Sequence, residues 1–96
     1  MINQRETKFV MMALAFPALW KADGIVPWNP NRLDIWAAEE ADAPEAIAAV
    51  QYLLSLWNPG FQWQCGSFNP RSAFQYWDCP HRLAYLDWAS RDSAIN

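Results

Sequence analysis

Apolar and polar residues repeat with a helical period over most of this 96-residue chain, most regularly between positions 44 and 57. Asp42 with Glu45 three residues later has the capping-box arrangement that starts a helix, and Pro44 suits its first turn. The sequence Asn58-Pro59-Gly60 ends it. Further Leu and Ala residues widen the apolar face, so we expect a central helix that is buried on most sides. The residues on that face are Ile47, Val50, Leu54 and Trp57.

An apolar run from Phe9 to Trp20 predicts a helix near the N-terminus. Asn3 with Glu6 forms a second capping-box pattern, and Pro17 ends or kinks the helix before a last turn from Pro17 to Lys21. The run resembles the apolar part of a signal peptide, but an acid precedes it and Lys21 follows it directly. It is also shorter than the roughly 20 residues that span a membrane. We expect a buried helix and no membrane contact.

A loop from Pro27 to Asn31 precedes the next predicted helix, which Asn31 caps and which runs from about Arg32 to Ala41. The loop contains Trp28 among several turn residues.

Two further helix starts lie close together in the C-terminal half. Asn69 before Pro70 is an N-cap followed by proline at the first helical position. Asp78 caps the next helix by accepting from the backbone N–H of His81. The pair therefore meets at a sharp corner near Asp78. The residues predicted to face the core are Ala73, Phe74 and Trp77 in the first helix and Leu83, Ala84, Leu86 and Ala89 in the second.

The segment from Phe61 to Phe68 alternates apolar and polar residues, which is the period of a strand. A single strand has no partner in this chain, so we interpret the segment as an extended loop packed by its aromatic rings, or at most a short hairpin arm. If its backbone is unpaired, it offers an edge to another chain; alternatively, Trp63 fills the core. The prediction is an all-α fold: one domain over residues 1–96, a compact bundle of about five short helices with an aromatic-rich loop between the third and fourth.

Charge excludes some partners. Ten acidic residues against seven basic ones give a net charge of −3, and the basic residues are scattered, which argues against direct nucleic-acid binding. Five acids between positions 34 and 45 form a negative stretch without Lys or Arg. They either solvate a helix surface or meet a basic partner. The acids are Asp34, Glu39, Glu40, Asp42 and Glu45.

The residues that carry chemistry are few. Cys65 and Cys79 do not have the paired spacing of a zinc site; we expect free thiols in a reducing cytoplasm, with a disulfide left open. The one histidine, His81, sits in the first turn of a helix, where a hydrogen-bonding role at the corner explains it. No nucleophile elbow, phosphate loop or metal motif is present. We expect no enzyme activity, metal or cofactor.

The C-terminal motif carries a resemblance. Residues 77–88 have the pattern WD-x-x-HR-x-A-aromatic-L-x-W. Its fixed positions are Trp77, Asp78, His81, Arg82, Ala84, Tyr85, Leu86 and Trp88. This resembles the C-terminal part of short uncharacterised proteins encoded in proteobacterial phages and other mobile elements. The resemblance implies an accessory protein of such an element, and it assigns no activity or catalytic residue. By analogy, small proteins of this setting bind host machines stoichiometrically, as anti-CRISPR proteins do.

The chain has seven Trp, five Phe and three Tyr, more large rings than so small a core can hold. The surplus predicts an exposed aromatic cluster that binds a host or phage protein complex, with the protein a monomer or small homo-oligomer. The alternatives are a small-ligand module with an aromatic-lined cavity of roughly 300 Å³ or more, and a DNA mimic. The predicted protein-binding residues are Trp28, Glu39, Glu40, Phe61, Trp63 and Arg82.

Overall fold

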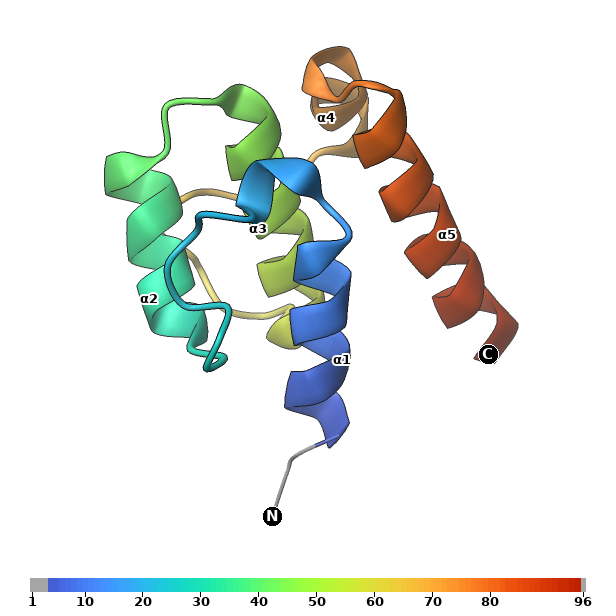
Figure 1. Ribbon diagram of the computed structural model, residues 1–96, viewed down its shortest axis with the longest axis horizontal. Coiled ribbons are helices and arrows are strands. Elements are labelled where there is room, and N and C mark those ends of the chain that lie inside the picture. The colour runs from blue at the N-terminus through green and yellow to red at the C-terminus, as the bar shows by residue number, and fades with distance from the viewer. Residues whose placement is uncertain (1–3, 96) are drawn as a thin grey trace.

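Five α-helices, a 3₁₀ turn and a π-helical turn make up the computed structural model, which describes residues 4–95 and the side chains of residues 4–91 (Figure 1). Its radius of gyration is 12.3 Å, close to the roughly 12.5 Å of a compact chain of this length. The all-α bundle predicted from the sequence is confirmed. The elements are α1 (Gln4–Leu14), η1 (Pro17–Leu19), α2 (Pro30–Ile35), η2 (Trp36–Glu40), α3 (Pro44–Trp57), α4 (Pro70–Tyr76) and α5 (Cys79–Ile95).

Prolines set where three of the helices begin. Pro30, Pro44 and Pro70 each occupy the first helical position, and the residue before each has extended backbone angles. The reason is steric, because the residue before a proline is kept out of the helical region. Asn69 caps α4 as predicted, its side chain accepting from the N–H groups of Arg71 and Ser72.

The same rule corrects two predicted caps. Asn29, not Asn31, caps α2 and accepts from the Arg32 N–H at 3.2 Å. Asp42 lies one residue too early to cap α3; Ala43 occupies that position and makes no side-chain cap. Asn3, the predicted cap of the first helix, lies outside the described residues.

Helix α3 lies at the centre of the fold, as its sequence predicts, and it contacts α1, η1, α2, η2 and α4 (Figure 1). Its side chains from Ala48 to Val50 and from Tyr52 to Leu54 are buried. Asn58 ends the helix with its N–H donating to the Leu54 carbonyl at 3.0 Å.

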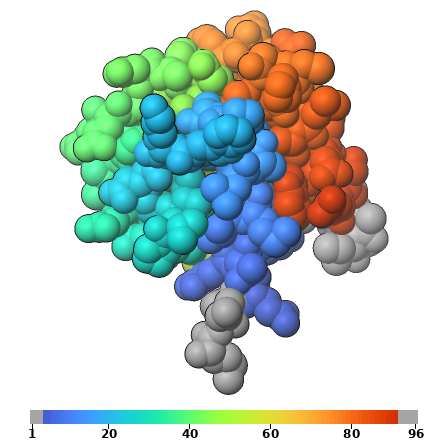
Figure 2. Space-filling view, in the orientation of Figure 1, coloured from blue at the N-terminus to red at the C-terminus, as the bar shows by residue number. Residues whose placement is uncertain are grey.

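In the N-terminal run Pro17 breaks the helix as predicted, but the run is buried on one side only, since Met11, Leu14 and Trp20 are exposed. Helix α1 ends at Leu14, and η1 starts at Pro17 as a separate short turn. Phe16 and Leu19 around this turn are fully buried. The turn brings the backbone of Ala18 to α5, which flanks the N-terminal segment in the space-filling view (Figure 2).

Helix α2 changes its winding at Trp36. The Ala41 N–H donates to the Trp36 carbonyl at 2.9 Å, which is the i to i−5 spacing of a π-helix. The helix therefore extends to Glu40, close to its predicted end, but its last turn is wider. Single π turns are rare and occur frequently at functional sites.

The loop between α3 and α4 is fixed by a buried carboxylate. Asp34 in α2 is 4% exposed, and its two oxygens accept from the N–H groups of Gln64 and Cys65, each at 2.9 Å. The segment forms no strand within residues 4–95, so the loop interpretation is confirmed. It is not extended throughout, because the Gly66 N–H closes a turn by donating to the Trp63 carbonyl at 3.1 Å. Asp34 is not part of the predicted negative surface, because these two donors hold it inside.

Helix α5 is rotated relative to the prediction. Its buried residues are His81, Ala84 and Trp88, whereas Leu83 and Leu86 are 61% and 47% exposed. His81 points to η1, and at about 100° per residue Leu83 and Leu86 then lie roughly 160° and 140° away from it around the helix. The predicted core stripe of Leu83 and Leu86 is therefore wrong.

Candidate binding surface

Trp28 belongs to a cluster at the edge of the core. Its ring centre lies 5.4 Å from those of both Phe9 and Trp57, and the Arg5 guanidinium lies 3.9 Å from the Trp57 ring centre. Trp28 is half-buried, and its indole N–H has no hydrogen-bond partner among the described residues. The ring therefore serves packing more than an exposed surface, contrary to the expected exposed cluster.

Phe61 and Trp63 form a pair of rings in the loop whose planes are inclined by 51°. Their ring centres are 4.4 Å apart, and the Trp63 indole N–H donates to the Leu54 carbonyl at 3.1 Å. Trp63 is half-buried, so it is only partly a core residue, whereas Phe61 is 51% exposed. Trp63 thus holds Phe61 at the surface in a fixed position.

Glu39 and Glu40 are exposed on the π turn η2. Glu40 lines a hollow of about 190 Å³ together with Asp23, Arg32, Ile35 and Trp36. In the ribbon view this turn and α5, which carries Arg82, lie on opposite sides of the molecule (Figure 1). The predicted residues therefore do not share one surface.

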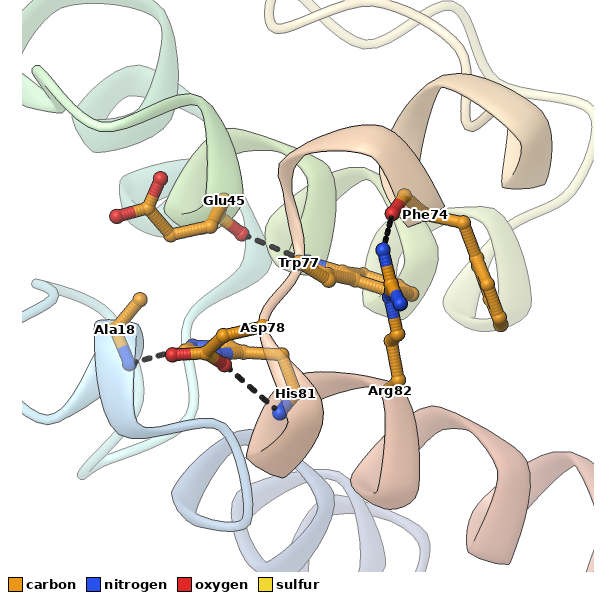
Figure 3. Close-up of polar contacts among 7 residues, drawn as sticks. All are labelled: Ala18, Glu45, Phe74, Trp77, Asp78, His81 and Arg82. Carbon is orange, nitrogen blue, oxygen red and sulfur yellow. Dashed lines mark hydrogen bonds and ion pairs between the residues drawn. The ribbon is translucent and has the colours of Figure 1, made fainter.

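Arg82 fixes the corner between α4 and α5 (Figure 3). Its guanidinium donates to the Phe74 carbonyl and lies 5.7 Å from the centre of the Phe74 ring. An exposed arginine over an aromatic ring at this distance gains a cation–π attraction. The contact gives Arg82 a structural role at the end of α4.

His81 bridges α5 and η1 with both ring nitrogens (Figure 3). Nδ1 lies within hydrogen-bond distance of the Asp78 carboxylate, and Nε2 accepts from the Ala18 N–H at 3.0 Å. With Nε2 accepting from the Ala18 N–H, Nδ1 is the nitrogen that donates to the Asp78 carboxylate. A general base needs a free nitrogen, and in this arrangement neither nitrogen is free.

Hydrogen bonds from His81 lower the pKa of Asp78, first from the imidazole and then from the backbone N–H. A carboxyl whose folded pKa is depressed stabilises the fold above its unfolded pKa of about 3.9 and loses that effect as pH falls through the folded value. We therefore expect wild type to exceed Asp78→Asn in urea midpoint at pH 7, and the gap to close below about pH 4. A constant gap across this range would contradict the assignment; Glu39→Gln, on an exposed acid, is the control.

A hollow of about 360 Å³ lies between α3 and α4, and the sequence did not predict it. Its α3 side is one helical stripe, namely Pro44, Ile47, Ala48 and Gln51. The opposite wall belongs to α4, where Tyr76 is 54% exposed. The residues that complete it are Ser67, Asn69, Ser72 and Ala73.

A second hollow of about 160 Å³ adjoins the first, because both are lined by Gln51 and Ser67. Phe61 and Trp63 line this second hollow, together with Ser55 from the same α3 stripe. We call the two hollows together the α3 groove. Of the predicted binding residues, Phe61 and Trp63 belong to it.

One sequence signal could have located the α3 groove. Within an otherwise apolar helix, the positions of Ala48, Gln51 and Ser55 place small and polar side chains on one face. Short side chains on such a face leave a groove when other elements of the fold flank the helix on both sides. Which elements stand there depends on the fold.

Within the described part of the chain, no three His, Cys, Asp or Glu side chains are grouped to hold a metal ion, and none of the helices is long and apolar enough to cross a membrane. Neither a protein-family model, nor a curated protein, nor a solved structure matches this chain.

Proposed function

We propose that this chain is a small protein-binding protein that docks its partner on the α3 groove, with Phe61 as the anchor. The supporting observation is the Phe61–Trp63 pair, in which an exposed ring rests on an indole that is hydrogen-bonded to the core. Interface cores are enriched in aromatic residues, and a pre-positioned ring loses little freedom when the partner packs on it. Phe61 fits that role better than the half-buried Trp28.

The resemblance of the C-terminal motif to phage and mobile-element proteins points to the class of partner. On this proposal the partner is a host or phage protein complex that the chain inhibits by stoichiometric binding. The motif residues Trp77, Asp78, His81 and Arg82 lie around the corner between α4 and α5, and their contacts tie that corner together and to α3 and η1. On this proposal the motif residues maintain a fold shared with those proteins, and other residues contact the partner. Two unpaired cysteines suit the cytoplasm as the site of action.

The test compares two exposed aromatic residues. We expect wild type to capture a partner from host lysate at a fixed stoichiometry, and Phe61→Ala to weaken that capture roughly 30-fold, as loss of a hot-spot residue does. Trp20→Ala, at a 69% exposed position outside the groove, should capture the partner as wild type does. Equal capture by both variants, each with a wild-type circular dichroism spectrum, would reject Phe61 as the anchor.

The volume of the larger hollow favours a second candidate, a small-ligand-binding module. At about 360 Å³ it reaches the lower end of the range for ligand pockets. A neutral metabolite that raises the melting temperature of wild type but not of Tyr76→Ala would support this reading. A DNA mimic has less support, because burial of Asp34 removes one of the clustered acids from the surface.

A further inference from the structure

From the lining of the α3 groove we infer that its occupant is an extended, uncharged segment of the partner polypeptide, about five residues long, with proline or aliphatic side chains. This inference rests on the proposed function and specifies its partner.

The length follows from the α3 stripe. The groove runs from Pro44 to Ser55, which are separated by eleven residue steps of α-helix. At about 1.5 Å per residue this is roughly 16 Å. An extended chain rises about 3.3 Å per residue, so about five residues match the groove.

The charge follows from the side chains. Among the described residues, no Lys, Arg, His, Asp or Glu lines either hollow. A charged ligand group would lose its hydration there without gaining a partner. The polar groups are amides and hydroxyls, which pair well with peptide groups. They belong to Gln51, Ser55, Ser67, Asn69, Ser72 and Tyr76.

Two of the amides are already oriented by the fold. Nε2 of Gln51 donates to the Cys65 carbonyl at 2.7 Å, and Oδ1 of Asn69 accepts from the first turn of α4. The remaining atoms are an acceptor, Oε1 of Gln51, and a donor, Nδ2 of Asn69. An extended peptide has unpaired N–H and C=O groups for both. A helix pairs most of its own backbone groups internally and has few to offer.

The ends of the groove select the side chains. Phe61 and Tyr76, both about half exposed, line the smaller and the larger hollow respectively. Aromatic-lined grooves of this kind recognise proline-rich and aliphatic segments, because a proline ring packs flat on an aromatic face and the extended backbone is already ordered.

The test uses a display library of short linear random peptides panned against the full chain. We expect the enriched peptides to share an uncharged core of about five residues rich in proline or aliphatic residues. Their binding should shift the side-chain amide resonances of Gln51 and Asn69. Ser72→Lys, at an exposed helical position, places a cation in the groove and should weaken binding at least tenfold. Leu83→Ala, at an exposed position of α5, is the matched control and should bind normally.

Several outcomes would overturn this inference. They are enrichment of charged peptides, equal binding by Ser72→Lys, saturation of the groove by a small molecule alone, or a homodimer that Ser72→Lys dissociates. If Phe61→Ala abolishes partner capture while no linear peptide binds, the inference fails and the proposed function stands. If neither protein partner nor peptide depends on Phe61, the proposed function fails.

Discussion

Asp34→Ala is expected to lower the free energy of unfolding by about 3–5 kcal/mol. The carboxylate is buried and accepts from two backbone N–H groups of the loop, at Gln64 and Cys65. Each hydrogen bond to a charged acceptor contributes about 1.5–3 kcal/mol, and the substitution leaves both donors without an acceptor. Urea denaturation followed by circular dichroism measures the loss.

Two companion variants test that explanation. Asp34→Asn keeps one acceptor but turns an amide NH₂ toward the other donor, so we expect an intermediate loss. Glu39→Ala removes an exposed acid of the same negative stretch and should change stability by no more than about 0.5 kcal/mol. Equal stability of Asp34→Ala and Glu39→Ala would show that the loop does not depend on the carboxylate.

Cys65 gives an independent readout of the same contact. Burial raises the pKa of its thiol to about 12, and a hydrogen bond and the negative charge of Asp34 add to the rise. The thiolate is the reactive form, so Cys65 should be almost inert to a thiol reagent at pH 8. In a Cys79→Ser background, which removes the exposed thiol, Asp34→Asn should increase the labelling rate of Cys65 at least tenfold.

Trp77→Ala is expected to cost about 4–5 kcal/mol. The ring is 2% exposed, and its indole N–H donates to the Glu45 carbonyl at 3.0 Å, joining α4 to the start of α3. Its substitution leaves a large cavity among four rings. Those rings are Phe16, Phe68, Phe74 and Tyr85, with centres 5.5 to 5.9 Å from that of Trp77. A domain with a total stability of about 5–15 kcal/mol would then be close to unfolding.

The controls for Trp77 separate packing from hydrogen bonding. Trp77→Phe keeps most of the ring volume and loses the hydrogen bond, so we expect a loss of about 1–3 kcal/mol. Trp20→Ala, at the most exposed tryptophan position, loses one exposed hydrogen bond to the Leu14 carbonyl and should cost no more than about 1.5 kcal/mol. A Trp77→Ala protein with the urea midpoint of Trp20→Ala would contradict the central place of Trp77 in the core.

The α3 groove explains why sequence analysis found only part of the candidate site. Phe61 and Trp63 were recognised because large rings in a segment without helical period indicate a loop packed by aromatic residues. Tyr76 and Gln51 were missed. Tyr76 occupies an ordinary helical position, and Gln51 becomes a groove residue only because the loop residue Cys65 lies against it.

The sequence by itself determined where the helices begin and end and which helix is central. Proline, asparagine and the apolar period act on backbone within a few residues. Asn69-Pro70 therefore determines the start of a helix, and the stretch from 44 to 57 forms a helix, without reference to distant contacts. The rotation of α5, the burial of Asp34 and the groove above α3 were decided only by the tertiary structure. Each depends on a contact between residues at least 14 positions apart, namely His81 with Ala18, Asp34 with the loop at Gln64, and Gln51 with Cys65. A local pattern contains no information about which distant group will form a hydrogen bond with a buried polar group. In this chain those distant hydrogen bonds decided which side chains face the core and which face the solvent.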